Sequence, residues 1–220
     1  MGTGQYDIVS FAVLLAMLSL VPLVVVVTTS FLKISLVMLV TRNALGVQQV
    51  PPTLAIYGIA LSITLFVMAP TVQEIGKRVV AIESESATGG KRTALLEQAQ
   101  NAFEPLRGFM LKHCKPEQRE IFLASAKKLW PKDYAATATS SDVLILVPAF
   151  VVSELQTGYE IAFLIYIPFV VIDLLVSNLL MALGMQQVSP QTITVPLKLL
   201  LFVMIDGWGK LLNALALSYT

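Results

Sequence analysis

The stretch ALGVQQVPP, residues Ala44 to Pro52, decides how this chain is read, because it recurs as ALGMQQVSP at Ala182 to Pro190. Seven of the nine positions are identical, and each copy joins two long apolar segments. Glycine and proline are the residues that most often mark turns between regular segments. Two matched hairpins in so apolar a chain predict a membrane assembly in which equivalent turns lie on one side and line a passage.

The composition places the chain in or against a membrane. It has 220 residues, of which 56% are hydrophobic and 13% charged, and a mean hydropathy of +0.77, well above the level of an ordinary soluble domain. A net charge of +1 gives no concentrated basic face for nucleic acid. With Cys114 as the single cysteine and His113 as the single histidine, an intrachain disulfide is impossible and a zinc site within one subunit is not expected.

Four apolar regions follow one another along the chain: Ile8 to Val40, Pro52 to Val72, Val143 to Leu183, and Thr192 to Leu217. As single helices, the first would be roughly 50 Å long and the third roughly 60 Å, against a hydrocarbon core near 30 Å. Pro22 in the first region, and Pro148, Gly158 and Pro168 in the third, are helix breakers. We therefore expect kinked or broken helices that pack mainly on other protein in one large complex.

Ionisable residues lie inside these regions, where exposure to lipid would cost several kcal/mol each; six of them are Lys33, Glu154, Glu160, Asp173, Lys198 and Asp206. Intramembrane carboxylates often relay protons, so this role is open for the three acids of the third region. Buried pairing with Lys33, with Lys198 or with a neighbouring subunit is the favoured interpretation. We predict that all six form buried charged contacts between helices.

The predicted organisation has three parts: an N-terminal hydrophobic hairpin at 1–72, a polar domain at 73–142, and C-terminal hydrophobic hairpins at 143–220. The middle part holds eleven of the fifteen basic residues and nine of the fourteen acids. Helical spacing predicts a helix at Thr93 to Leu111 with a bend at Pro105, and a second helix that starts near Pro116 and stops before Pro131. The fold class is therefore all-α, an integral membrane protein of kinked hairpins with a small helical polar domain inserted.

The orientation rests on short loops, because long connections translocate whatever their charge. Arg42 favours a cytoplasmic first loop, with Asn43, Gln48 and Gln49 beside it. Both turns would then face the cytoplasm, and the polar domain and both termini would lie on the far side, which is the periplasm in a bacterium. The opening MGTGQYD has no Lys or Arg, so we expect the first apolar segment to be retained and not cleaved as a signal.

No enzyme motif is visible. TGGKRT, at Thr88 to Thr93, lacks the first glycine and the Ser or Thr that a phosphate-binding P-loop needs. A catalytic triad would depend on His113, and neither G-x-S-x-G nor H-E-x-x-H occurs. We expect no enzyme activity, no cofactor and no metal. Met185 could serve in a soft seal because thioether side chains adapt their shape, although most methionines of apolar chains simply fill space.

Several long motifs resemble one family. They are TSFLKISLVMLVTRNALGVQQVPP (Thr29 to Pro52), LFVMAPT (Leu65 to Thr71), PAFVVSEL (Pro148 to Leu155), YIPFVVIDLLVSNLLMALGM (Tyr166 to Met185), SPQTITVPLKLLLFV (Ser189 to Val203) and DGW (Asp206 to Trp208). The chain resembles the core export-gate proteins of type III secretion, the FliP/SctR family that includes YscR, HrcR and SpaP. The form of the RNALGVQQVPP loop and the absence of an N-terminal signal are similar to the injectisome branch.

The resemblance implies a bacterial inner-membrane protein that assembles in five copies with the smaller FliQ/SctS-like and FliR/SctT-like proteins, beside a switch protein of the FlhB/SctU type. The resulting helical cone, raised toward the periplasm and in contact with membrane lipid, would conduct unfolded secreted proteins. The family's methionine-bearing loop corresponds here to Met185 through Val188, so Met185, Gln186 and Gln187 are the predicted pore constriction. Many relatives carry several methionines there, whereas this chain has one, which predicts a mixed ring of Met and Gln.

Two other functions fit parts of the same pattern. An ion-coupled secondary transporter would explain the matched hairpins and the carboxylates near the middle of the membrane. A non-conducting scaffold that nucleates assembly without touching substrate would explain the long, charged helices. Movement of a small solute by the purified protein alone would favour the transporter, and failure of a stalled substrate to crosslink at the second turn would favour the scaffold.

Overall fold

The computed structural model describes residues 3–47, 49–86, 101–185 and 187–220, and over these residues the chain is helical with no strand. The predicted all-α fold class is confirmed. The elements in chain order are α1 (Thr3–Thr28), α2 (Phe31–Ala44), α3 (Thr53–Ser86), α5 (Glu104–His113), α6 (Pro116–Leu129), α7 (Lys132–Thr137), α8 (Val143–Ala182), α9 (Gln191–Met204) and α10 (Gly207–Leu217).

The first apolar region is broken, as predicted, but the break is not at Pro22. Pro22 lies inside α1, and the chain turns at Thr29 and Ser30 before α2 begins. The hydroxyls of Thr28 and Thr29 donate to the carbonyls of Val24 and Val25, at 2.7 and 2.6 Å. Hydroxyl groups that bond back to the preceding turn compete with the backbone ladder and bend helices. The bend therefore comes from consecutive threonines and not from the proline.

The third region was expected to kink or break at Pro148, Gly158 or Pro168, and the expectation of a break is wrong. All three lie inside α8, a continuous helix of 40 residues, about 60 Å long at 1.5 Å per residue. A Cβ added at Gly158 would lie 2.9 Å from the Cδ2 of Leu36. Gly158 thus permits close packing of α8 on α2.

The fourth region contains a break that prolines did not signal. The axes of α9 and α10 differ by 62°, and the two helices are separated by Ile205 and Asp206. Asp206 adopts a left-handed backbone conformation with φ 53°. A Cβ added at Gly207 would lie 2.4 Å from the ring of Phe202. The DGW motif therefore makes a tight corner that only glycine permits at its second position.

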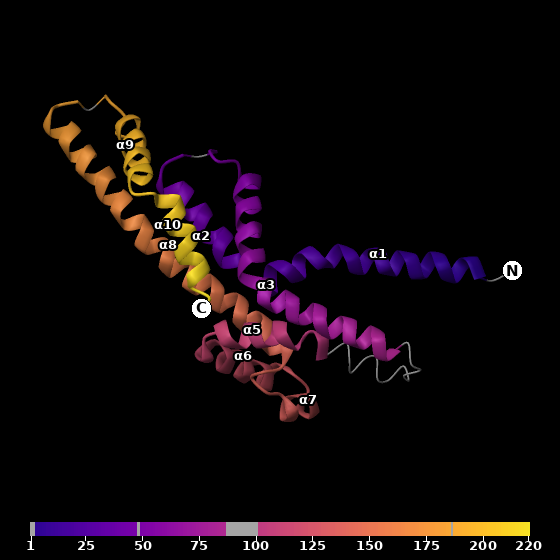
Figure 1. Cartoon of the computed structure of the whole chain (residues 1–220). Helices are drawn as coiled ribbons and strands as arrows, with labels where there is room; N and C mark the ends of the chain where they lie inside the picture. Colours follow the sequence, from indigo (N-terminus) through magenta and orange to yellow (C-terminus); the bar gives the residue numbers. More distant parts are fainter. Residues whose placement is uncertain (1–2, 48, 87–100, 186) are drawn as a thin grey trace.

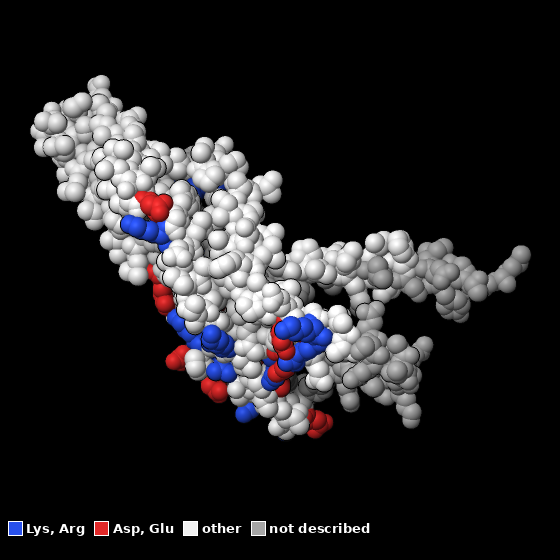
Figure 2. Space-filling model, viewed as in Figure 1, with Lys and Arg blue, Asp and Glu red and all other residues white. Residues whose placement is uncertain are grey.

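The hydrophobic helices form two neighbouring hairpins, and the polar helices collect at one end (Figure 1). The α2–α3 turn and the α8–α9 turn both lie at the upper end of the view, and α5 to α7 lie at the lower end. Figure 2 shows most of the visible charged side chains over that lower end. The central core packs α2, α3, α8 and α10 around Ile34, Met38 and Ile56, which have no exposed surface.

The polar segment follows the predicted pattern in part. A helix begins at Pro116 and ends at Leu129, as predicted, and Pro105 lies in the first turn of α5, where proline is tolerated. Residues 93–100 of the other predicted helix lie outside the described residues. The proposed division at residue 72 falls within α3, which runs unbroken to Ser86.

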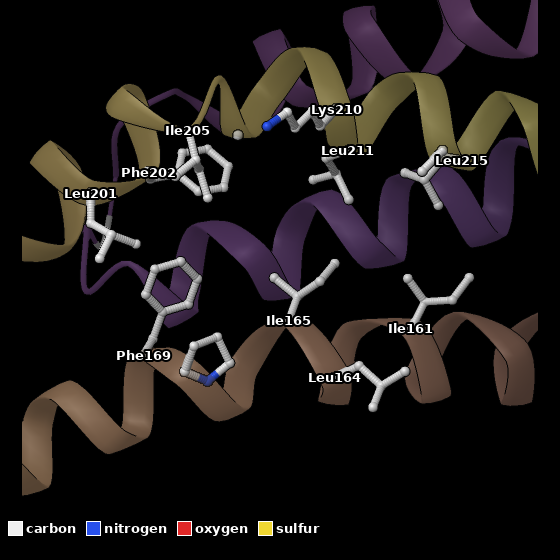
Figure 3. Close-up of a pocket in the computed structure, with 13 residues that line it drawn as sticks. Ile161, Leu164, Ile165, Phe169, Leu201, Phe202, Ile205, Lys210, Leu211 and Leu215 are labelled. Carbon is white, nitrogen blue, oxygen red and sulfur yellow. The ribbon is translucent and has the colours of Figure 1, made fainter.

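Three described helices are long and apolar enough to cross a membrane, over Phe11–Thr28, Thr53–Ala81 and Val143–Ala182, and the bent α9–α10 pair makes a fourth if it counts as one span. Most of their surface is not covered within the chain. One uncovered region is an apolar groove of about 630 Å³ between α8 and the α9–α10 pair (Figure 3). The fold is that of a multi-pass membrane protein.

Candidate functional site: the paired turns and the buried charges

The first turn is closed by its own side chains. After α2 ends at Ala44, Gly46 takes a left-handed conformation with φ 79°, and its N–H donates to the carbonyl of Asn43 at 3.0 Å. Arg42 reaches across the turn and donates to the carbonyl of Pro51 and the hydroxyl of Thr53, at 3.3 and 3.0 Å. Of the other residues predicted for this loop, Asn43 and Gln49 are exposed, and Gln48 lies outside the described residues.

The second turn has the same backbone signal. After α8 ends at Ala182, Gly184 has φ 70° and donates to the carbonyl of Met181 at 3.0 Å. Met185 follows with 44% of its side chain exposed, and Gln187 is exposed as well. Gln186, the third predicted constriction residue, lies outside the described residues. A glycine with positive φ just past a helix satisfies the last carbonyls of the helix, so the shared ALG letters encode one local geometry twice.

The structure brings the two turns to one polar cleft. The cleft has a volume of about 550 Å³ and is bordered by Asn43, Ala44 and Gly46 of the first turn and by Ser189, Pro190 and Gln191 beyond the second. A Cβ added at Gly46 would lie 2.8 Å from the Cγ2 of Val195 in α9. The first turn therefore packs directly on the helix that the second turn starts.

Lys198 is the polar centre of this contact. Its ammonium donates to the carboxylate of Asp173 in α8 at 2.5 Å and to the carbonyl of Ala44 at the end of α2 at 3.2 Å. The Lys198 side chain is 5% exposed and that of Asp173 is 44% exposed. A buried ammonium needs both a counter-charge and hydrogen-bond acceptors. Lys198 thus joins three helices, α2, α8 and α9, at the base of the paired turns.

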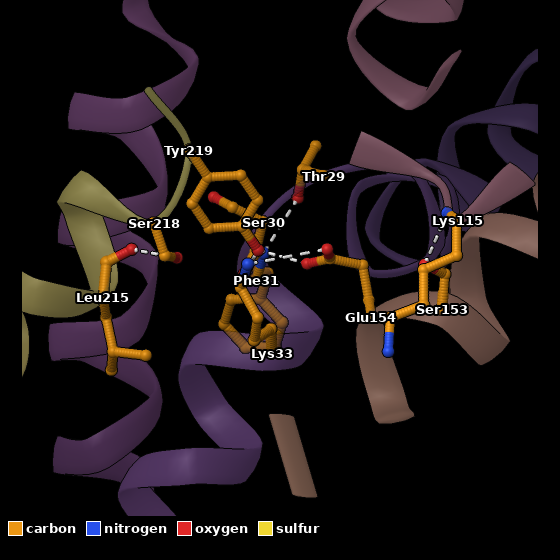
Figure 4. Close-up of polar contacts among 10 residues, drawn as sticks. All are labelled: Thr29, Ser30, Phe31, Lys33, Lys115, Ser153, Glu154, Leu215, Ser218 and Tyr219. Atoms are coloured by element: carbon orange, nitrogen blue, oxygen red, sulfur yellow. Dashed lines mark hydrogen bonds and ion pairs between the residues drawn. The ribbon is translucent and has the colours of Figure 1, made fainter. Parts of the chain in front are cut away.

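A second buried ion pair lies toward the other end of α2. The ammonium of Lys33 is 3.6 Å from Oε1 of Glu154 in α8, and both side chains are less than 5% exposed. The other carboxylate oxygen, Oε2, accepts a hydrogen bond from the hydroxyl of Tyr219. The Lys33 ammonium also lies 3.6 Å from the centre of the Tyr219 ring, where the ring face attracts a cation. Figure 4 shows Lys33, Glu154 and Tyr219 converging from α2, α8 and the segment after α10.

Tyr219 also connects this pair to the polar helices. Its hydroxyl lies 3.4 Å from the carbonyl of Ser30, at the α1–α2 break. Its ring stacks on Phe109 at 5.8 Å and meets His113 edge-on at 5.1 Å. The backbone N–H of Lys115 donates to the hydroxyl of Ser153 in α8 at 2.9 Å, one residue before Glu154. The N-terminal hairpin, the polar helices and the C-terminal hairpin therefore meet around one carboxylate.

Two of the six predicted buried charges are exposed within the chain. Glu160 pairs with Lys115 at 3.0 Å, and its side chain is 56% exposed. It lies six residues after Glu154, on another face of α8, so it meets the polar segment and not the core. Asp206 is exposed at the α9–α10 corner, where it has a left-handed backbone conformation. Burial of these two residues against a neighbouring subunit stays a prediction.

His113 and Cys114 lie where burial disfavours the charged forms of both side chains. Burial, together with the nearby charges of Lys112 and Lys33, lowers the pKa of His113 to about 4. Burial also raises the pKa of the Cys114 thiol, which disfavours the reactive thiolate. No group of three or more potential metal ligands occurs among the described residues.

The same motifs identify the family. The FliP family model matches residues 14–215. The chain belongs to the FliP family. It is 51% identical to the harpin secretion protein HrpW of Pseudomonas syringae pv. syringae, over 94% of this chain and 99% of that protein. It is 47% identical to the harpin secretion protein HrcR of Erwinia amylovora over the full length of both.

A third FliP-family relative, the Yop proteins translocation protein R of Yersinia pestis, is 43% identical over 97% of each chain. The prediction of a FliP/SctR protein of the injectisome branch is confirmed by these matches. The FliP-family motifs also mark the residues that the structure groups: Lys33 and the first turn in one motif, Glu154 in another, and Asp173 with the second turn in a third.

Three residues that contact the buried and exposed carboxylates of α8 were not predicted from the sequence. Tyr219, Ser30 and Lys115 complete the network around Glu154 and Glu160. A tyrosine that follows an apolar helix gives no local signal of its partner, and Lys115 is one of eleven basic residues of the polar segment. One signal was available: the Glu154 carboxylate has more hydrogen-bond acceptor sites than a single lysine fills. A further donor to Glu154 could therefore have been expected.

Proposed function

We propose that this chain forms the channel of a type III secretion export apparatus, through which unfolded proteins cross the bacterial inner membrane. Membership of the FliP family makes it a component of that apparatus and a multi-pass inner-membrane protein. The proposal adds that several copies, five by analogy with the family, surround a central passage. It also places Met185, Gln186 and Gln187 at the constriction of this passage.

The observation that carries the proposal is the contrast between the two matched turns. The first is packed on α9 and tied by Arg42 and Lys198. The second projects beyond α8 with Met185 and Gln187 exposed. Because Leu183, Met185 and Gln187 are exposed among the described residues of the second turn, these side chains are free to contact other copies or a passing polypeptide.

The chemistry of the second turn suits a seal. A thioether side chain is flexible and polarizable, so it can close around surfaces of varied shape. Glutamine amides offer both donors and acceptors to an unfolded backbone. A ring that combines the two closes less tightly than one of methionine alone, which leaves part of the closure to partner proteins of the FliQ/SctS, FliR/SctT and FlhB/SctU types.

The buried charges hold helices in place within this proposal. Glu154 and Asp173 each pair with a lysine. These ion pairs account for the two carboxylates without a role in proton relay. Because the pairs join α2 to α8 and α8 to α9, they fix the two hairpins relative to each other. The charged helices α5 to α7 lie opposite the turns (Figure 1), which suits turns on the cytoplasmic side and polar helices raised toward the periplasm.

The test is the conductance of the assembled complex. Replacing Met185, Gln186 and Gln187 by glycine in the full complex is expected to raise the conductance of small ions while the complex still assembles, because the side chains that fill the constriction are gone. Gln49→Gly is the matched control, since Gln49 is the exposed counterpart of Gln187 in the first turn. Unchanged conductance in reconstituted complexes would remove these residues from the gate.

The alternatives give different results in related experiments. A crosslinking probe at Gln187 is expected to react with a stalled substrate, and no reaction there would favour a scaffold that never touches substrate. Solute transport by this chain alone in liposomes would favour a secondary transporter. Passage of polypeptide that requires the partner proteins would support the export channel.

A further inference from the structure

Helix α10 is held at its two ends more than along its length. It starts at the tight corner of Asp206 and Gly207, where a Cβ on Gly207 would lie 2.4 Å from the ring of Phe202. Along the helix, the buried side chains are those of Leu211 and Leu215. Toward α8, the apolar groove lies between the two helices (Figure 3). The contacts at the far end of α10 therefore decide how firmly the helix is attached to the body.

The far end is held by Tyr219, which follows the end of α10 at Leu217 by two residues. Tyr219 is 7% exposed. Its hydroxyl donates to the carboxylate of Glu154 in α8 and lies 3.4 Å from the carbonyl of Ser30, at the α1–α2 break. The ammonium of Lys33 in α2 lies 3.6 Å from the centre of its ring. One side chain thus attaches α10 to α2, to α8 and to the break between α1 and α2 (Figure 4).

The ring of Tyr219 also meets the polar helices. It stacks on Phe109 of α5 at 5.8 Å and meets His113 edge-on at 5.1 Å. These separations lie within the roughly 4.5–7 Å at which aromatic rings attract one another. Figure 1 shows α10 running from its corner with α9 toward the end of the molecule where α5 lies. Loss of the Tyr219 ring would therefore uncover one face of α5 as well as free the end of α10.

We propose that α10 and the two residues after it form a strap, with a fixed corner at Asp206 and Gly207 and a latch at Tyr219. The closed latch gives a hydrogen-bond donor to the buried carboxylate of Glu154 and covers the aromatic face of α5. A buried carboxylate that loses a donor is costly, so docking of α5 and closure of the strap support each other. All these contacts lie within one chain, so the strap does not depend on the proposed channel.

The hydroxyl and the ring of Tyr219 make different contacts, so the two halves of the latch are separable. The hydroxyl reaches Glu154 and the carbonyl of Ser30, whereas the ring reaches α5 through Phe109 and His113. Tyr219→Phe removes the hydroxyl contacts and keeps the ring. Tyr219→Ala removes both. A latch of this kind predicts that α10 responds to both variants and that α5 responds to Tyr219→Ala alone.

Hydrogen exchange of the backbone amides in the purified full chain in detergent tests the latch, because exchange reports local opening. In Tyr219→Phe, we expect the α10 amides to exchange about tenfold faster, since the buried carboxylate has lost a donor, while α5 is unchanged. In Tyr219→Ala, we expect exchange about a hundredfold faster in α10, because a buried ring is gone. Exchange in α5 is then expected to be about tenfold faster, because its aromatic partner is missing.

Two matched controls separate the latch from ordinary packing. Leu211 is buried in α10, about two helical turns before Tyr219. Leu211→Ala is expected to speed exchange in α10 and to leave α5 unchanged. Tyr134 is a tyrosine of α7 with 68% of its side chain exposed, and Tyr134→Ala is expected to change neither helix.

Helix α9, which Lys198 attaches to α2 and α8, is the internal reference. Faster exchange confined to α10 and α5 in Tyr219→Ala, with α9 unchanged, supports the strap. Unchanged exchange in α10 would show that Tyr219 does not hold it. Faster exchange in α10 with α5 unchanged would reduce Tyr219 to a packing residue of α10. Equal acceleration in α9 would mean that the whole body loosens. Each of these last three results overturns the proposal.

Discussion

The two turns of this chain share seven of nine residues, yet they have opposite environments. Leu45 in the first is 2% exposed and packs with Phe169 and Phe202, whereas its counterpart Leu183 is 65% exposed. Gly46 presses against Val195, whereas a Cβ at Gly184 would meet nothing within 4 Å. What the two turns share is a left-handed glycine after a helix.

The difference shows that the repeated letters specify how the helix ends and not what the turn does. The first turn is a structural joint, held by Lys198 and Arg42. The second is presented outward at the end of a helix about 60 Å long, where only another molecule can cover it. Three pairs of matched variants test how far this division holds.

The largest contrast is expected between Leu45→Ala and Leu183→Ala. Truncating a fully buried leucine costs about 2–5 kcal/mol through lost burial and the cavity left behind. Truncating an exposed one changes stability by about 0.5 kcal/mol or less. Thermal unfolding of the purified chain in detergent measures the difference. Equal losses from both variants would show that the second turn is also buried in the folded chain.

The next contrast concerns the charge that anchors the first turn. Asp173→Asn leaves the buried ammonium of Lys198 without its counter-charge, and we expect a loss of about 2–3 kcal/mol, below the range for a fully buried pair because Asp173 is half-exposed. Glu160→Gln is the matched control on the same helix, since its pair with Lys115 is exposed and is worth about 1 kcal/mol or less. Thermal unfolding of both variants under identical conditions measures the two losses of stability. An equal loss from Glu160→Gln would contradict the role of Asp173 as the counter-charge that anchors the first turn.

The smallest contrast is between Gly46→Ala and Gly184→Ala. Both place a side chain in a left-handed conformation, at a cost of about 1–2 kcal/mol. Gly46→Ala also pushes against Val195, and such overpacking adds about 1–3 kcal/mol where the neighbours cannot shift. The excess loss for Gly46→Ala is therefore the quantity to measure. Equal losses of stability from the two variants would show that Val195 in α9 can shift to accommodate the added methyl group. The packing of the first turn on α9 would then be less tight than the distance indicates.

Much of the fold follows from local rules that act on neighbouring residues. Pro116 starts a helix as predicted, because proline fits the first turn. The prolines of α8 do not break the helix, and Gly158 lets α2 pack closely on it. The bend at Thr29 came from hydroxyl groups that no proline rule counts.

For the candidate site, the sequence predicted most of the charged residues but not their partners. The motifs that resemble the export-gate family contained Lys33, Glu154, Asp173 and Lys198, and the family is confirmed. Which carboxylate meets which lysine was left open, because the partners are far apart in the sequence and come together only when α2, α8 and α9 pack. Tyr219 was invisible for the same reason.

The sequence by itself determined an all-helical membrane chain, its FliP family, and two glycine-ended helices with the same turn after each. These properties depend on composition and on the conformational preferences of a few adjacent residues. Only the tertiary structure decided that Leu45 of the first turn is buried and Leu183 of the second exposed, and that α1 stands apart from the body. Burial depends on which surfaces distant helices bring together, and identical letters carry no information about that.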